Sequence, residues 1–294
     1  MPVLNRLLAT LAALCLSLSL STAALAGPTV VTYPRPESLD DDIGEYGIAL
    51  LQLALDKSGN HYLAQLSAAR MQQNRAIIEL QSGSGRIDVV GTVTSRERED
   101  AMLPIRIPMT RGLIGWRLAL VDADRRDLLR EVRSQADLQA LPTGQGQDWP
   151  DLRILRHSGF KVEPVMVYHN LFGMLHAGRI MWAPRSVNEI WAEATAHPEL
   201  AVDPYIALRY PSADYFFVRN GNTALADDIR RGLEAALADG SFEKLFYKHY
   251  GPLIRKARLE QRRLISIPNP LLSPETPLTR KELWFSLEDI KRMP

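Results

Sequence analysis

The chain has 294 residues, of which 46% are hydrophobic and 23% are charged, with 35 basic residues against 34 acidic ones. This near-neutral balance excludes the basic excess that nucleic-acid-binding proteins usually carry. The length suffices for two domains with cores of their own, and the single cysteine, Cys15, excludes a disulfide within the chain.

The N-terminus is typical of an export signal. Arg6 precedes an apolar run over residues 7–20, and Ala24-Leu25-Ala26 supplies the small residues that a signal peptidase recognises. We expect residues 1–26 to be removed, which leaves 34 basic and 34 acidic residues in a periplasmic protein. A membrane anchor is the alternative, but the apolar run is short for a span. Because Cys15 lies inside this run, we do not expect it to carry a lipid.

Strands and helices alternate after the signal. Residues 28–33 are rich in β-branched side chains and predict a strand. Residues 44–57 have apolar residues at helical spacing, and residues 61–67 and 69–81 predict a second strand and a second helix. Residues 87–90 are short and apolar, as a buried parallel strand is. This alternation predicts an α/β fold with parallel strand pairs.

Two extended stretches predict crossings between two lobes. Residues 102–121 and 205–218 are rich in aliphatic residues and are interrupted by proline or glycine. Residues 224–239 then predict a long helix, and residues 242–250 predict another that ends at Gly251-Pro252. The shorter elements that we expect elsewhere are helices beginning near 137 and 149 and over 171–176, 187–196 and 279–290, with extended stretches at 161–164 and 180–182.

Two segments carry a family resemblance. Leu80–Glu99 contains Gly-Arg-Ile-Asp ahead of a loop with threonines and arginines, and Gly-Arg-Ile recurs at 178–180. Tyr215–Asn222 is followed by Leu225, Ile229 and Leu233 and then by Asp239–Phe242. In order and spacing, residues 28–251 resemble the type II periplasmic solute-binding proteins of family 3, which bind polar amino acids. The resemblance implies two α/β lobes that close on a solute by hinge motion.

The resemblance and the crossings together suggest a domain organisation. We expect the first lobe to comprise residues 27–113 and 213–294, and the second lobe to comprise residues 114–212. The tail from about residue 252 lies beyond the family pattern, and nothing in its sequence assigns it a role.

Ligand contacts in an open α/β lobe are expected in loops beyond the C-terminal ends of the strands. Tyr33 and Arg35 end the first strand and offer an aromatic wall and a charge, unless this loop is only surface. Between the first strand and the first helix the chain also carries proline residues, which favour a loop.

A second loop holds Thr92, Thr94, Arg96 and Arg98. The resemblance implies that its polar groups and one arginine hold the carboxylate of a ligand, a task that suits the donor fork of a guanidinium. Either arginine can be the one, and the polar run that follows favours Arg98. The alternative is that one or both form structural ion pairs with neighbouring acidic residues.

The third loop is Gly144-Gln145-Gly146, which we expect to precede a helix with Asp148 as its N-cap. A glycine-rich loop at a helix start leaves backbone N–H groups free for an anion. We therefore count Gln145, Gly146 and Trp149 as candidate ligand contacts. Trp149 either stacks on the ligand or lies in the lobe core.

The fourth segment departs from the family. The resemblance implies an acidic residue near Arg185, where amino acid binders pair with the ligand's ammonium group, but this chain has Arg185 and Ser186 there. An unpaired buried charge costs several kcal/mol. We therefore expect a small polar solute that is anionic, or at least not a simple α-amino acid.

These patterns predict a binding protein for ABC-type uptake, with a small-molecule solute and a membrane permease as partners. The alternative is a sensor that presents the solute to a membrane receptor, and a dehydratase-like enzyme on the same fold is a weaker one. No nucleophile or paired-carboxylate motif stands out, so we expect no enzyme. The six histidines lack metal-ligand spacing, so we expect no metal and no cofactor. We also expect a monomer without a nucleic-acid partner.

Overall fold

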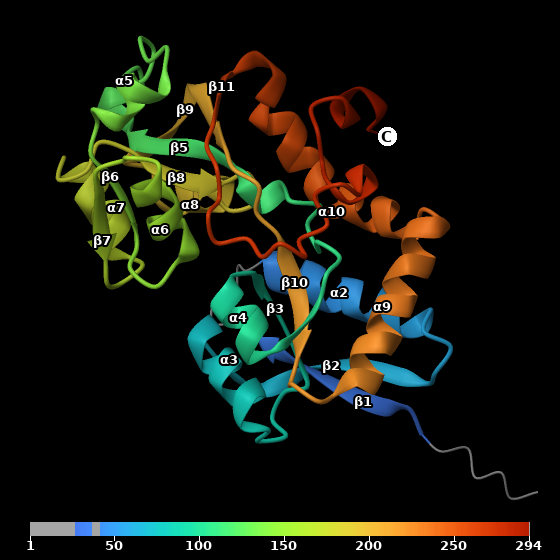
Figure 1. The fold of residues 1–294 in the computed structure, drawn as a ribbon. Helices are drawn as coiled ribbons and strands as arrows, with labels where there is room; N and C mark the ends of the chain where they lie inside the picture. The colour runs from blue at the N-terminus through green and yellow to red at the C-terminus, as the bar shows by residue number, and fades with distance from the viewer. Residues whose placement is uncertain (1–26, 37–41, 294) are drawn as a thin grey trace, which may run out of the picture.

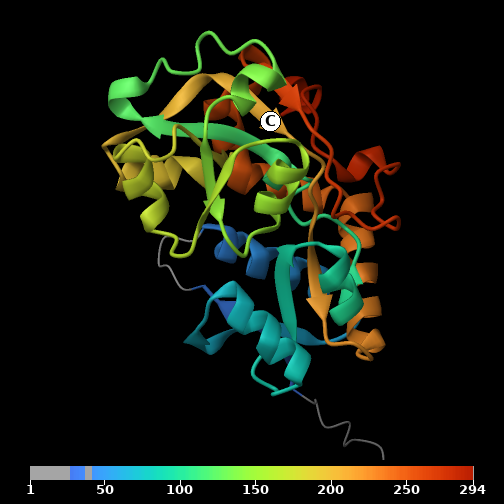
Figure 2. The same ribbon diagram turned by 60° about the vertical axis from the view of Figure 1, so that its left-hand side comes forward.

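The computed structural model describes residues 27–36 and 42–293, so the expected signal peptide lies outside the described residues. Two α/β lobes, one below the other in Figure 1, are joined by the chain segments that precede β5 and β10 (Figures 1 and 2). The predicted α/β architecture with two lobes is therefore confirmed.

The first lobe is built on two small sheets. β1 (Thr29–Arg35) pairs in parallel with β2 (Tyr62–Arg70), as the alternation predicts. β10 (Asp214–Val218) returns from the second lobe and lies antiparallel between β3 (Val89–Val93) and β4 (Leu103–Ile105). The helices of this lobe are α2 (Asp42–Asp56), α3 (Gln73–Ser82), α4 (Arg96–Ala101) and α9 (Thr223–Ala238).

The second lobe has a sheet of four strands in the order β11-β9-β5-β8 and a pair β6-β7. β5 (Trp116–Asp122) is buried at every position, between β8 (Ala183–Ser186) and β9 (Leu200–Arg209). The remaining elements are α5 (Gln135–Gln139), β6 (Thr143–Gly146), α6 (Pro150–His157), β7 (Val162–Val165), α7 (Asn170–His176) and α8 (Ile190–Ala196).

Hydrogen bonds hold the two crossings together. The backbone N–H of Met109 donates to the Asp214 carbonyl (2.8 Å), and the N–H and hydroxyl of Thr110 both donate to Asp214 Oδ1 (3.1 and 2.8 Å). Gly115 lies so close to Tyr210 that an added Cβ would overlap the Tyr210 carbonyl oxygen. The sequence therefore needs glycine at this contact.

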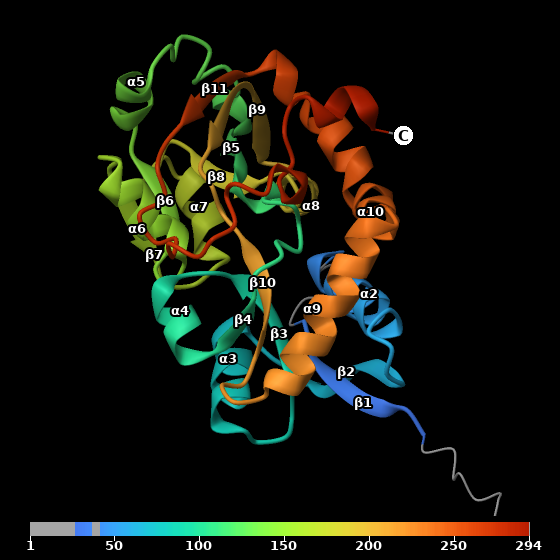
Figure 3. The same cartoon turned by 45° about the vertical axis from the view of Figure 1, so that its right-hand side comes forward.

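Helix α10 (Ser241–Ala257) spans the two lobes (Figure 3). The ring of Tyr250 packs 4.7 Å from that of Tyr46 in α2, and Lys256 lies 4.4 Å from the ring of Trp191 in α8. The predicted helix end at Gly251-Pro252 is wrong, because the helix continues through both residues. A proline removes one helical hydrogen bond, and burial of residues on both sides of it, such as Ile254, offsets that loss.

The tail after α10 follows the crossings (Figure 3). β11 (Arg263–Ser266) pairs in parallel with β9 of the second lobe. Further along the tail, the Leu271 carbonyl accepts a hydrogen bond from the Arg96 N–H of the first lobe (3.3 Å). The Phe285 N–H of the tail then donates to the Arg111 carbonyl (2.7 Å). The lobe boundaries stay a proposal, and β11 adds tail residues to the sheet of residues 114–212.

Three further local predictions are corrected. Residues Thr143–Gly146 form a strand instead of a loop, because their backbones pair with β7 and with Trp182. The extended stretch expected at 180–182 lies at Ala183–Ser186, where it pairs with β5. The expected helix at 279–290 is replaced by 3-10 turns at Lys281–Leu283 and Asp289–Arg292. Among the described helices, none combines the length and the apolar content that crossing a bilayer requires.

The contact between α2 and α9 tests the packing of the first lobe. A Cβ on Gly232 would overlap the Ala54 carbonyl oxygen, so Gly232→Ala should lower the free energy of unfolding by about 1–3 kcal/mol or more. Gly173→Ala is the matched control, because nothing lies near its added Cβ in α7 and alanine favours a helix by roughly 0.5–1 kcal/mol. Urea unfolding measures both, and equal stability of Gly232→Ala and the wild type would contradict this packing.

The hinge carboxylate predicts a dependence of stability on pH. Burial raises the pKa of Asp214 to about 6, although hydrogen bonds from Thr110 lower it. The native state thus binds more protons than the unfolded state between about pH 4 and 6, so this carboxyl makes stability fall as pH rises through that interval. Asp214→Asn should match the wild type at pH 4 and exceed it by roughly 2–3 kcal/mol at pH 7.

Denaturant unfolding at both pH values checks this expectation. Asp100→Asn, which changes an exposed carboxylate in α4, should leave the difference between the two pH values as it is in the wild type. If Asp214→Asn instead lost the same free energy of unfolding at pH 4 and at pH 7, the charge of Asp214 would not be what destabilises the folded protein.

Candidate ligand site between the lobes

A cavity of about 290 Å³ lies where α4 of the first lobe faces the start of α6 in the second lobe. Ser95, the N-cap of α4, accepts a hydrogen bond from the Arg98 backbone N–H (3.3 Å) and so fixes the start of the helix that lines the cavity. The lining residues are Ser95, Glu97 and Arg98 from the first lobe, Gln147, Asp148, Trp149, Pro150 and Arg153 from the second, and Leu271 from the tail.

Arg98 is the half-buried cation of this cavity. Its Nη1 donates to Thr92 Oγ1 (2.8 Å) and to the Val93 carbonyl (2.5 Å), and its Nη2 donates to Gln73 Oε1 (3.0 Å). These acceptors are neutral, and in the described part of the chain no carboxylate forms an ion pair with Arg98. Burial lowers the pKa of Arg98, opposed by the nearby charges of Asp151 and Glu97. Its positive charge is thus left for another partner.

Arg96 takes a different role. Its Nε donates to the Leu272 carbonyl (3.2 Å), and its backbone N–H donates to the neighbouring Leu271 carbonyl. Arg96 is exposed and does not line the cavity. Of the two arginines that the sequence left open, the geometry therefore favours Arg98 as the ligand contact.

The two threonines also differ. Thr92 supports Arg98, as described, and so positions it. Thr94 is buried and donates to Glu99 Oε1 (2.6 Å), whose other carboxylate oxygen accepts from Arg106 and Ser273 (both 2.8 Å). Thr94 therefore belongs to a polar network between the first lobe and the tail.

Tyr33 and Arg35 lie away from this cavity. Tyr33 is buried, and its ring meets that of Phe216 edge to face with a centroid distance of 6.1 Å. Arg35 donates from Nε to the Ser67 carbonyl (2.9 Å), beside the pairing of β1 with β2. Neither residue lines the cavity of about 290 Å³.

Arg185 is neutralised inside the second lobe. Its Nε and Nη2 donate to both oxygens of Glu193 (2.8 and 2.5 Å), and Glu189 lies 3.1 Å from Nη2. Its guanidinium also stacks on Trp149, 4.7 Å from the ring centroid. Arg185 therefore adds no free charge to the cleft, and the reason that the sequence offered against an ammonium-bearing ligand no longer holds.

Gln145, Gly146 and Trp149 lie together where β6 leads into α6. The Gln145 side chain is fully buried, and neither of its polar atoms has a hydrogen-bond partner among the described residues. Gly146 leaves room for the Trp149 ring, which an added Cβ would overlap. Trp149 both lines the cavity and stacks on Arg185.

The expected N-cap of α6 is corrected. Trp149 occupies the N-cap position without a side-chain cap, and Pro150 is the first helical residue. Because Asp148 does not cap the helix, its exposed carboxylate is free to line the cavity.

Sequence reasoning missed an ion pair across the cleft. Arg153 Nη1 of α6 lies 2.7 Å from Glu97 Oε1 of α4, and both side chains are exposed. The signal available in the sequence was that both α4 and α6 carry acidic and basic residues near their N-termini. Leu271 was also missed, and its place in the tail gave no signal at all.

The fold is similar to that of proteins with solved structures. No family model matches the chain, and no curated protein sequence matches it. Among solved structures, an ancestral arginine-binding protein bound to arginine matches with 21% identity and a TM-score of 0.55, over 76% of this chain and 99% of that one. The chain has the two-lobe fold of periplasmic solute-binding proteins.

Two further structures show the range of this binding-protein fold. A probable amino-acid ABC transporter extracellular-binding protein from Bacillus subtilis matches with 17% identity and a TM-score of 0.57, over 76% of this chain and 98% of that one. A histidine kinase sensor domain with similarity to periplasmic binding proteins matches with 18% identity and a TM-score of 0.53, over 76% and 96%. About a quarter of this chain thus has no counterpart in them.

Proposed function

We propose that this protein captures a small, carboxylate-bearing solute between its lobes in the periplasm and delivers it to an ABC-type membrane permease. The carrying observation is Arg98, a half-buried guanidinium that lines the cavity and is held only by neutral acceptors. Such a guanidinium offers a carboxylate two parallel, charge-assisted hydrogen bonds.

The start of α6 supports an anionic group at this place. The first N–H groups of a helix lack partners within the helix, and the helix dipole adds partial positive charge there. Trp149 caps α6 without a side-chain acceptor, and it lines the cavity together with Arg98. An anion in this cavity would therefore meet donors from both lobes, which is what lobe closure around a ligand requires.

Two carboxylates that line the cavity, Glu97 from the first lobe and Asp148 from the second, decide which solutes fit. Glu97 is neutralised by Arg153, whereas Asp148 forms no ion pair in the described part of the chain. A ligand with an ammonium group can place that group at Asp148. Because Arg185 is neutralised as well, an α-amino acid competes with a purely anionic solute, and the first experiment separates the two.

Binding is tested on the purified protein by thermal shift and calorimetry with L-arginine, agmatine, succinate and succinamide. Agmatine and succinamide are the partners that lack the carboxylates. We expect L-arginine or succinate to raise the melting temperature, because a ligand of the folded state alone stabilises it, and we expect its carboxylate-free partner to bind far more weakly. Equal binding of both partners would contradict the proposal.

Arg98→Gln tests the residue that carries the proposal. Because charge-assisted hydrogen bonds contribute about 1.5–3 kcal/mol, we expect the affinity for the bound carboxylate to fall by roughly tenfold or more. Arg96→Gln is the matched control on the same helix and should bind within about twofold of the wild type. Calorimetry measures both variants, and unchanged binding in Arg98→Gln would refute its role.

A sensor is the second candidate, because one matched structure is a histidine kinase sensor domain. The two roles predict different results when the gene is deleted. Loss of uptake of the bound solute supports transport. An altered transcriptional response with unchanged uptake supports presentation of the solute to a receptor.

A further inference from the structure

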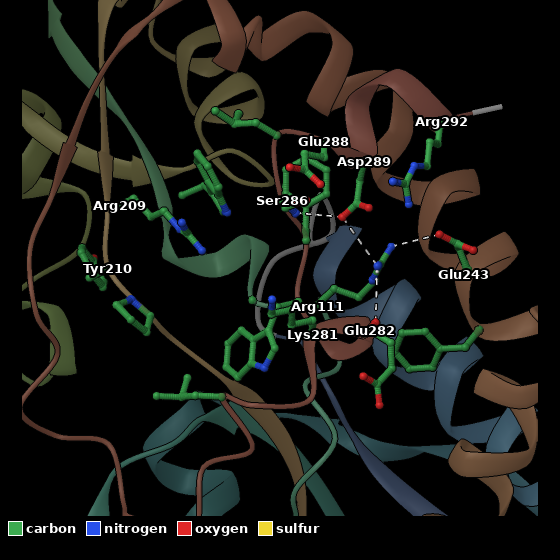
Figure 4. A pocket seen from close by; sticks show the side chains of 18 of the residues that line it. Arg111, Arg209, Tyr210, Glu243, Lys281, Glu282, Ser286, Glu288, Asp289 and Arg292 are labelled. Carbon is green, nitrogen blue, oxygen red and sulfur yellow. Dashed lines mark hydrogen bonds and ion pairs between the residues drawn. The ribbon is translucent and has the colours of Figure 1, made fainter.

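A second cavity, of about 850 Å³, lies on another side of the crossings (Figure 4). Its walls come from the two crossings, from the start of α10 and from the tail, and it shares no lining residue with the cavity between α4 and α6. The tail contributes Trp284 and its neighbours. The site is therefore separate from the cleft in which we propose solute binding.

Arg209, the last residue of β9, carries a free charge in this cavity. Its guanidinium stacks on Trp116 at 4.7 Å from the ring centroid. Its side chain makes no hydrogen bond or ion pair with any residue that the structure describes. Burial alone lowers the pKa of Arg209, and no carboxylate opposes that shift. A guanidinium stacked in this way is half-desolvated and presents its donor edge to the cavity.

The cation on the opposite wall is already neutralised. Arg111 lies 3.2 Å from Glu243 and 3.7 Å from Asp289, and its Nη2 donates to the Glu282 carbonyl (3.4 Å). In Figure 4 dashed lines join Arg111 to Glu243, Glu282 and Asp289, and none reaches Arg209. Of these two arginines, Arg111 has carboxylate partners, whereas Arg209 has none among the described residues.

The other charges at the rim leave Arg209 without a counterion among the described ion pairs. Lys281 and Arg292 are exposed and form no ion pair within the described residues, whereas the Glu282 carboxylate is bound by Arg280 outside the cavity (2.8 Å). Glu288 is exposed and is the one lining carboxylate without a cation among the described ion pairs. The cavity is lined by equal numbers of basic and acidic side chains, namely Arg111, Arg209, Lys281 and Arg292 against Glu243, Glu282, Glu288 and Asp289. The place for an anionic group is therefore set by the unpaired guanidinium of Arg209 and not by the overall charge.

The walls give the ligand an apolar body. Trp116, Tyr210, Trp284 and Phe285 line the cavity. Trp284 lies against Gly112, where an added Cβ would be 2.5 Å from the indole ring. Flat aromatic walls favour a flat ligand, because stacked and edge-to-face contacts add to the burial of apolar area.

We propose that this cavity is a second ligand site, for a small aromatic carboxylate. The carboxylate pairs with the free guanidinium of Arg209, and the aromatic body packs against Trp116 and Trp284. Because both crossings and the tail line it, an occupant contacts all three segments of the hinge. The proposal does not depend on what binds between the lobes.

The test uses purified protein with benzoate and with benzamide, which has the same shape without the charge. We expect calorimetry to show that benzoate binds and that benzamide binds at least tenfold more weakly. Arg209→Gln should weaken benzoate binding at least tenfold. Arg130→Gln is the matched control, since this arginine also stacks on an aromatic ring, that of Tyr205, but lies outside the cavity. Equal affinity of benzoate and benzamide would overturn the proposal.

Two further arms locate the bound benzoate. Arg98→Gln should leave benzoate affinity unchanged, and a loss in that variant with none in Arg209→Gln would place benzoate in the cleft and overturn the second site. The NMR signals of the Trp116 and Trp284 indoles, assigned through Trp→Phe variants, should shift on titration of the wild type. This readout holds even if Arg209→Gln fails to fold, and the absence of any shift would refute the site.

Discussion

The carboxylate of Asp214 ties the two crossings together, and the arrangement of the lobes depends on this contact. Its Oδ1 accepts both donors of Thr110, and its carbonyl accepts the N–H of Met109. Tyr46 of α2 donates to the carbonyl of Met109 (2.7 Å), which connects the same point to the core of the first lobe. Burial of a carboxylate costs free energy, and here the carboxylate lies where the two crossings meet.

Ion pairs with buried or nearby carboxylates separate the arginines that have a counterion from those that we propose as ligand contacts. Arg185 forms an ion pair with Glu193, and Arg111 forms ion pairs with Glu243 and Asp289. Arg98 and Arg209 are half-buried and have only neutral neighbours within bonding distance. Both lie in cavities, at different sides of the crossings. The two proposals therefore follow from one principle, namely that a partly desolvated charge without a counterion is a place for one.

The tail and α10 add constraints that the two crossings alone would not impose. β11 extends the sheet of the second lobe, and Leu271 reaches α4 of the first. One apolar cluster, which includes Leu118 of β5 and Phe216 of β10, runs through both lobes. These contacts thus connect the two lobes in addition to the two crossings.

The sequence by itself determined the alternation of strands and helices and the resemblance carried by Leu80–Glu99, because hydrophobic period and turn residues act over a few positions. It also narrowed the arginine that we propose to hold a carboxylate to Arg96 or Arg98. Only the tertiary structure put Arg98 in the wall of the cavity and Arg96 outside it, gave Arg185 its partner Glu193 and paired β11 with β9. Those outcomes depend on contacts between residues that are distant in the sequence and on which charges are buried together. Local sequence patterns do not encode such contacts, because the free energy that decides them comes from packing and desolvation in the folded chain.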